Sequence, residues 1–235
     1  MIDYARLEHL LTAALQLTRR PVAVAFRDTP PAGVARLQGA QPSGCSFWRL
    51  AAGGDVFYTV PSDHYNCPVG SYTHNIPLPA EREGQLTQVL ALMTDIGYLR
   101  MEEVPGIPRL PATPAVAIYA PLGDTPVDPD VVLVAGQPAR LMLLHEAAAR
   151  AARPMQPLLG RPTCMAIPAA LTGGVASSLG CIGNRVYTGV ADQEFYTVIA
   201  GRDVETVSAE MATISSANVA LADYHQERRR TISAR

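Results

Sequence analysis

Residues 161–185 read RPTCMAIPAALTGGVASSLGCIGNR and contain two of the four cysteines of the chain, Cys164 and Cys181. Glycines flank Cys181, so backbone N–H groups can approach whatever its sulfur holds. An earlier segment repeats the arrangement, with Cys45-Ser-Phe-Trp48 followed by Asn66-Cys67-Pro-Val-Gly70. The two segments together predict a site centred on cysteines.

The composition describes a folded protein and narrows its chemistry. The chain has 235 residues, of which 48% are hydrophobic and 17% charged, enough for one large domain or two small ones. A net charge of −2 excludes bulk electrostatic attraction as the basis of nucleic-acid binding. All 19 basic residues are arginine, which excludes a lysine that forms a Schiff base or binds a nucleotide phosphate.

Nothing in the sequence predicts export or membrane insertion. The N-terminal residues have an amphipathic helical pattern rather than the basic and apolar regions of a signal peptide. No apolar run approaches the roughly 18 residues of a membrane span. We therefore expect a cytoplasmic protein, in which cysteines are buried, metal-bound or catalytic more often than disulfide-bonded.

Hydrophobic periodicity predicts a single compact α/β protein, with a mixed α+β arrangement as the alternative. Short β-branched or apolar runs predict strands, at residues 21–26, 55–60, 114–119, 131–134 and 195–199. Apolar residues at helical spacing predict helices, at residues 3–19, 32–40, 83–97, 138–152 and 203–229. The proline-rich segment 104–114 is expected to be a connector without regular structure.

The two halves of the chain resemble each other, which suggests an old duplication with lobes at residues 1–103 and 114–235. Each half has a valine-rich strand, a cysteine, a Gly-Gly pair, a second cysteine and then Tyr-Thr. Residues 130–155 would be an insertion in the second half. On this interpretation the four cysteines meet at the lobe junction, across a pseudo-twofold axis. The alternative is two unrelated halves that share ordinary strand composition.

Four chemistries fit the cysteines at positions 45, 67, 164 and 181. An iron–sulfur cluster needs about four thiolates, an apolar surround and N–H groups aimed at sulfur. Structural zinc also takes four cysteines, but normally through paired short spacings, and the sequence has no C-x-x-C. A thiol redox pair or nucleophile is the third chemistry, and cysteines that are simply small buried residues are the fourth.

Polar residues near the cysteines are candidates for catalysis or for a ligand pocket. His64 would be a general acid–base, or else a capping residue in a polar loop. Arg185 would bind a carboxylate or phosphate, or else pair with an acidic side chain at 192 or 194. Four further residues would line the pocket, and they are Trp48, Asn66, Ser178 and Asn184. A tryptophan such as Trp48 is more often a core residue than a platform on which a substrate stacks.

Several motifs are missing from the sequence. It contains no G-x-G-x-x-G after a strand, no Walker lysine, no G-x-S-x-G and no H-E-x-x-H. Nucleotide hydrolysis, serine hydrolysis and zinc proteolysis therefore lose support.

The chain resembles the DUF169 family of bacterial and archaeal proteins over about residues 5–225. The resemblance is carried by five motifs, namely Pro21-Val-Ala-Val-Ala-Phe26, Cys45-Ser-Phe47, Asn66-Cys67-Pro-Val-Gly70, Cys164-Met-Ala-Ile-Pro168 and Ser178-Leu-Gly-Cys-Ile-Gly-Asn-Arg185. It implies a shared fold and a shared cysteine-lined site, and no established reaction.

The leading hypothesis is a redox protein or enzyme with an iron–sulfur cluster on the four cysteines, acting on a small molecule or with an electron-transfer partner. The second is a non-catalytic module that binds a metal or small ligand, with zinc or free thiols. The third is a nucleophilic enzyme in which His64 activates Cys67, which requires the two side chains to lie within hydrogen-bonding distance.

Overall fold

The structure is a computed structural model that describes residues 2–157 and 160–233. In this part of the chain, six strands form one antiparallel sheet with the order β2-β3-β1-β4-β6-β5. The strands are β1 (Val22–Arg27), β2 (Phe57–Thr59), β3 (Val116–Pro121), β4 (Val131–Gly136), β5 (Val175–Ser178) and β6 (Phe195–Ala200). The helices are α1 (Tyr4–Leu15), α2 (Gly44–Ala52), α3 (Pro68–Thr73), α4 (Gly84–Asp95), α5 (Pro138–Arg150), α6 (Ala166–Gly173), α7 (Ile182–Thr188) and α8 (Gly201–Ser233).

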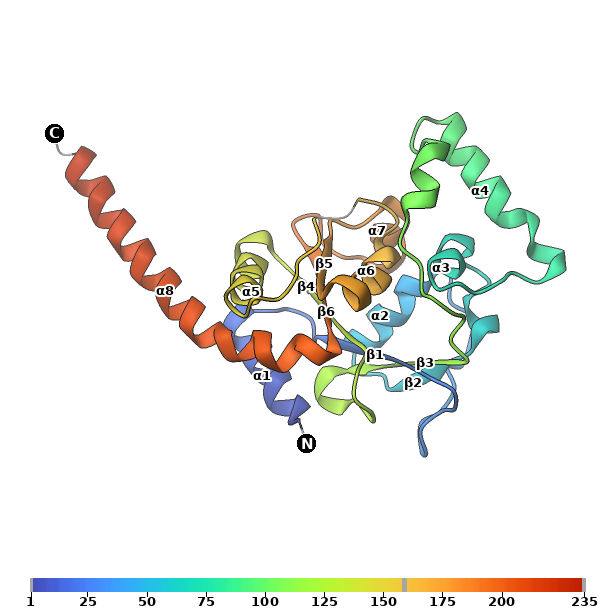
Figure 1. Cartoon of the computed structure of the whole chain (residues 1–235), viewed down its shortest axis with the longest axis horizontal. Coiled ribbons are helices and arrows are strands. Elements are labelled where there is room, and N and C mark those ends of the chain that lie inside the picture. The colour runs from blue at the N-terminus through green and yellow to red at the C-terminus, as the bar shows by residue number, and fades with distance from the viewer. Residues whose placement is uncertain (1, 158–159, 234–235) are drawn as a thin grey trace.

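Helices cover both faces of the sheet, because the central strands bury both sets of their alternating side chains. In β1, Val22 and Val24 point to one face and Ala23 to the other. The face of Val22 and Val24 packs against α2 and α6, while α3 and α7 lie against α2. The opposite face packs against α1, α5 and the first turns of α8 (Figure 1). All four cysteines come from the helices and turns of the first of these two layers.

The two halves of the sheet have the same strand order. The first half of the chain contributes β1, β2 and β3, and the second half contributes β4, β5 and β6. From the centre of the sheet to its edge, the order is β1, β3, β2 in the first half and β4, β6, β5 in the second. One cysteine, Cys45, lies in the helix before β2, and another, Cys164, lies just ahead of the helix before β5. A further cysteine is the N-cap of the next α-helix after each of these two strands. This order would place a boundary between β3 and β4, so that β4 is an equivalent of β1 rather than part of an insertion. The duplication itself stays a prediction.

The sequence located five of the six strands and the longer helices, and it missed the short elements. The helix expected at residues 32–40 is wrong, because this segment is extended and pairs with β2 through Leu37 N–H to Tyr58 O and Tyr58 N–H to Ala35 O. Glycines with φ near +80° at 33 and 39 bound it and are incompatible with a helix. Four short helices were not predicted, namely α2, α3, α6 and α7, and neither was strand β5.

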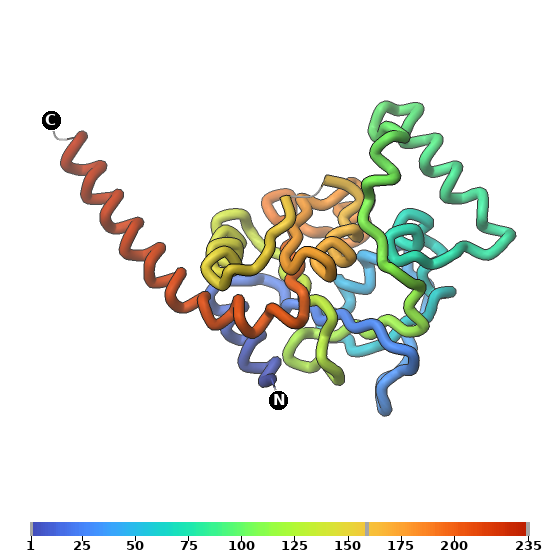
Figure 2. The backbone as a smooth tube through the Cα atoms, viewed as in Figure 1, coloured from blue at the N-terminus to red at the C-terminus, as the bar shows by residue number. Residues whose placement is uncertain are grey.

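Two helices extend away from the body of the molecule. The backbone trace shows α4 standing out on one side and the second half of α8 on the other (Figure 2). The buried residues of α8 all lie before position 212, and α4 has none. Among the described residues, no helix combines the length and the apolar character that crossing a membrane requires.

Candidate functional site

One cavity of about 400 Å³ is lined by all four cysteines. Each comes from the beginning of a different helix. Cys45 is in the first turn of α2, Cys67 is the N-cap of α3 and Cys181 is the N-cap of α7. Cys164 lies in a 3-10 turn, Thr163–Met165, that leads directly into α6. Backbone N–H groups at the start of a helix lack partners within the helix, so they are available to the sulfurs.

The Cys67 sulfur sits in a close-fitting backbone cradle. Pro68 occupies the first helical position of α3, where its missing N–H is no loss. The Gly70 N–H donates to the Cys67 sulfur over 3.3 Å, and the nearby Gly44 N–H also lowers the pKa of Cys67. A Cβ on Gly70 would stand 2.9 Å from this sulfur. Position 70 therefore has to be glycine for the backbone to approach the sulfur so closely.

Hydrogen bonds also connect the segments that carry Cys164 and Cys181. The Cys181 N–H donates to the Thr163 hydroxyl over 2.6 Å, and Thr163 is fully buried. Ser178, predicted to line the pocket, instead closes the turn before Cys181. Its hydroxyl donates to Gly160 O and accepts the N–H of Gly180. Ser178 is buried and positions the cysteine rather than facing the cavity.

Burial holds three of the four thiols in this site, those of Cys45, Cys67 and Cys164, in their neutral form. Burial raises the pKa of Cys45 and Cys164 well above the usual range, and the charges of neighbouring cysteines raise both further. Burial also raises the pKa of Cys67, while the two backbone N–H groups oppose that shift. Since a thiolate is the attacking form of cysteine, this environment disfavours a nucleophile. Positive charge in the cavity would reverse the preference.

Asn184 is the polar side chain most deeply buried in the cavity wall, with 2% of its surface exposed. It comes from α7, one turn after Cys181. Its carboxamide lies beside the Cys45 thiol and lowers its pKa slightly against the effect of burial. Neither the nitrogen nor the oxygen of the carboxamide has a well-formed hydrogen bond. Such a group in an apolar wall points to a missing partner.

His64 lies in the core rather than on the cavity. Its Nε2 pairs with the Thr59 hydroxyl over 2.9 Å, and its ring packs edge-on against Phe47 with the centroids 4.9 Å apart. The Cys67 sulfur bonds backbone N–H groups and not this ring. The geometry does not support activation of Cys67 by His64. His74 is also buried, with 2% exposed.

The two buried histidines predict acid sensitivity. Burial lowers the pKa of His64 to about 3 and of His74 to about 4, from an ordinary 6.5. Below pH 6.5 the two histidines are protonated in the unfolded chain but stay neutral in the folded protein. Their contribution to the unfolding free energy is therefore full above pH 6.5 and falls as the pH drops towards 4. Each histidine should lower the unfolding free energy by about 2 kcal/mol when the pH falls from 6.5 to 5.

Urea unfolding at pH 7 and pH 5 tests this expectation. The doubly substituted protein with His64→Gln and His74→Gln should lose most of the difference in unfolding free energy between the two pH values. The exposed His225→Gln substitution on α8 is the control and should keep the difference. Equal pH dependence in the double variant and the wild type would show that the two histidines do not cause it.

Arg185 holds a loop together and does not line the cavity. Its guanidinium donates to the backbone carbonyls of Leu179, Ala191 and Glu194 and pairs with Asp192 at 3.9 Å. The acidic partner considered from the sequence is therefore present, and the carbonyls are additional. This side chain connects the turn before Cys181 to the loop before β6.

We expect Arg185→Lys to lower the unfolding free energy by about 1–3 kcal/mol, because an ammonium group cannot reach the same spread of carbonyls. Urea denaturation measures the change. Arg229→Lys, at an exposed position of α8, is the matched control and should have no effect. Equal stability of both variants would mean that the carbonyl bonds contribute nothing net.

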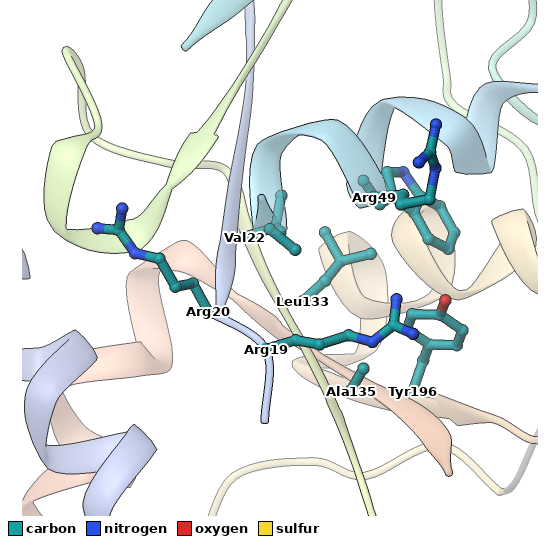
Figure 3. A pocket seen from close by; sticks show the side chains of 9 residues that line it. Arg19, Arg20, Val22, Arg49, Leu133, Ala135 and Tyr196 are labelled. Carbon is teal, nitrogen blue, oxygen red and sulfur yellow. The ribbon is translucent and has the colours of Figure 1, made fainter. Parts of the chain in front are cut away.

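Trp48 does not line the cavity and lies in the core, where its ring packs edge-on against Tyr196 with the centroids 5.5 Å apart. It borders a separate small pocket, in which Arg19 lies beside Tyr196 and Arg20 turns away (Figure 3). This pocket measures about 20 Å³, room for about one water molecule. Trp48 is thus a core residue in this structure.

The other cavity residues divide into those predicted and those missed. Asn66 was predicted and lies at the cavity, with its amide already bonded to Gln41 O and to Arg82. Arg161 and an apolar wall from α4 were not predicted as site residues. The apolar periodicity of residues 86–93 predicted the α4 helix. The sequence could not show which part of the protein the apolar face of this helix lies against.

No group of three or more His, Cys, Asp or Glu side chains in residues 2–157 and 160–233 is arranged to hold a single metal ion. Four sulfurs on one tetrahedral zinc ion would lie about 4 Å apart, given zinc–sulfur distances of about 2.3 Å. The four cysteines border the same cavity, yet their sulfurs do not form such an arrangement. The larger core of an iron–sulfur cluster keeps its ligands farther apart.

The chain was compared with family models, with curated proteins and with solved structures. No match was found among curated proteins or among solved structures. A family model described as DUF169, uncharacterised ArCR, matches residues 10–210, which include the whole sheet and all four cysteines. The chain therefore belongs to the DUF169 family.

Proposed function

We propose that Cys45, Cys67, Cys164 and Cys181 hold an iron–sulfur cluster, and that the protein acts in electron transfer or as a redox enzyme on a small molecule. The observation that carries the proposal is the convergence of four cysteines, from four separate segments, on one cavity. The chain has no other cysteine, so every sulfur that could ligate iron borders this space.

The donor set fits such a cluster in three respects. Four thiols supply the usual number of ligands. Backbone N–H groups of Gly44 and Gly70 already point at the Cys67 sulfur. Burial holds the thiols of Cys45, Cys67 and Cys164 in the neutral form, and bound iron would provide the positive charge that makes thiolates favourable there.

The residues around the cysteines would then tune the site. A bound cluster would supply one-electron transfer. The N–H donors on Cys67 and the carboxamide of Asn184 beside Cys45 would stabilise negative charge on sulfur, which favours the reduced state. The apolar side chains of the wall would lower the polarity around the site.

Purification without oxygen tests the proposal. We expect brown protein with a broad visible absorbance and with iron and acid-labile sulfide in nearly equal amounts. Colourless, metal-free protein that stays colourless after anaerobic reconstitution would reject it. Stoichiometric zinc without sulfide would instead favour a non-catalytic metal-binding module.

A further inference from the structure

The α4 helix presents an apolar face that the body of the protein does not bury. It carries several large apolar side chains, and none of its residues is buried. Leu92 on α4 and Ile96 just after it are 58% and 67% exposed. A helix in a folded protein normally packs such a face against a core. In Figure 1, α4 stands out from the body above α3, with its ends tied back by the flanking segments.

This face forms one wall of the cysteine cavity. The α4 wall comprises Val89, Leu90, Leu92 and Met93. Across from it lie apolar residues of the helices that carry the cysteines, among them Val69 of α3 and Ile182 of α7. The volume of about 400 Å³ is within the range of small-molecule sites, about 300–1,000 Å³. The walls suit a mainly apolar molecule.

Two polar groups in the wall lack partners. The Asn184 carboxamide is unbonded at both atoms, and the Nε of Arg161 is buried without an acceptor. The charge of Arg161 is already balanced by Glu103 at 3.4 Å, and its guanidinium stacks on Tyr98 at 4.5 Å. Asn184 is neutral and the charge of Arg161 is already paired, so these two N–H donors would not neutralise the charge of a carboxylate. They suit an uncharged acceptor oxygen better.

We propose that this cavity binds a small, uncharged, mainly apolar carbonyl compound. Its apolar body lies against α4, and its carbonyl oxygen accepts hydrogen bonds from Asn184 and Arg161. The inference rests on the proposed function, because it names the class of small molecule that would bind next to the cysteines. Its test gives a result whether or not a cluster is present.

The test uses Nile red, an uncharged apolar dye, as a fluorescent reporter on the anaerobically purified full chain. Three competitors share one ring system, namely 1-indanone, indane without the carbonyl, and 2-indanecarboxylate with a charge. We expect 1-indanone to displace the dye at concentrations about tenfold lower than indane, or about 1.4 kcal/mol. The carboxylate should be the weakest competitor. Asn184→Val should remove the advantage of 1-indanone over indane.

A matched pair of α4 variants locates the site. Leu90→Arg places a charge in the apolar wall and should abolish dye binding, while Thr87→Arg, exposed and off the wall, should not. Indane and 1-indanone competing equally, or no saturable dye binding at all, would overturn the proposal. A wild-type dimer that Leu90→Arg dissociates would also overturn it, since α4 would then cover a second copy.

The colour of the protein separates the two proposals. Brown protein that binds no dye would reject the carbonyl ligand and leave the cluster. Colourless protein that binds dye with preference for 1-indanone would reject the cluster and support the ligand site.

Discussion

Cys164→Ser is expected to remove nearly all bound iron and acid-labile sulfide, together with the visible absorbance. Cys164 is 4% exposed, and no other cysteine can replace it, because the remaining three already border the same cavity. Serine has nearly the same size and leaves the packing of α6 intact, but its hydroxyl is a poor ligand for iron. Anaerobic iron and sulfide analysis against protein concentration measures the loss.

Ile182→Ala is the matched control for this substitution. It changes another residue of the cavity wall, 64% exposed, that cannot ligate a metal. The control should keep its iron and its colour. Circular dichroism and thermal unfolding of both variants establish that each is folded. If folded Cys164→Ser kept wild-type iron and sulfide, Cys164 would not be a ligand and the four-cysteine site would be wrong.

The second large effect concerns the fold. Gly201→Ala is expected to lower the unfolding free energy by about 3 kcal/mol or more. Gly201 joins β6 to α8, and its N–H donates to Asp130 O over 2.6 Å. A Cβ there would stand 1.7 Å from Pro129 O, a backbone atom that cannot rotate away. The joint between α8 and the sheet would have to open.

Urea unfolding measures this change, with Gly84→Ala as the control. Gly84 is the first residue of α4, and the nearest atom to an added Cβ is the flexible Gln88 Nε2 at 4.0 Å. Alanine should be neutral or stabilising there by up to about 1 kcal/mol. Wild-type stability in Gly201→Ala would mean that the backbone around residues 129–130 yields without cost.

Periodicity and residue type located most of the sheet, because its strands are short apolar runs that have to be buried. The strand β5 was missed since Val175–Ser178 is four residues long and half polar. Its serines are buried because their hydroxyl groups form hydrogen bonds, such as that between Ser177 and the Thr197 hydroxyl of β6. The helices α2 and α6 were missed because they are short, and α6 is apolar on all sides, which leaves no helical period to detect.

The site was partly predictable for a related reason. The cysteines could be grouped from the sequence, since all four have glycine or proline close by and no local pairing. The roles of His64 and Arg185 depended on side-chain direction. His64 turns into the aromatic core beside Phe47, and Arg185 reaches carbonyls up to nine residues away. Tertiary contacts determine both directions, and sequence spacing does not encode them.

Anomalous scattering at the iron absorption edge, from crystals grown without oxygen, tests the central claim most directly. The account predicts one compact iron peak inside the cavity, bounded by the sulfurs of Cys45, Cys67, Cys164 and Cys181. A cavity without iron, bordered by four free thiols in protein reconstituted with iron and sulfide, would contradict it.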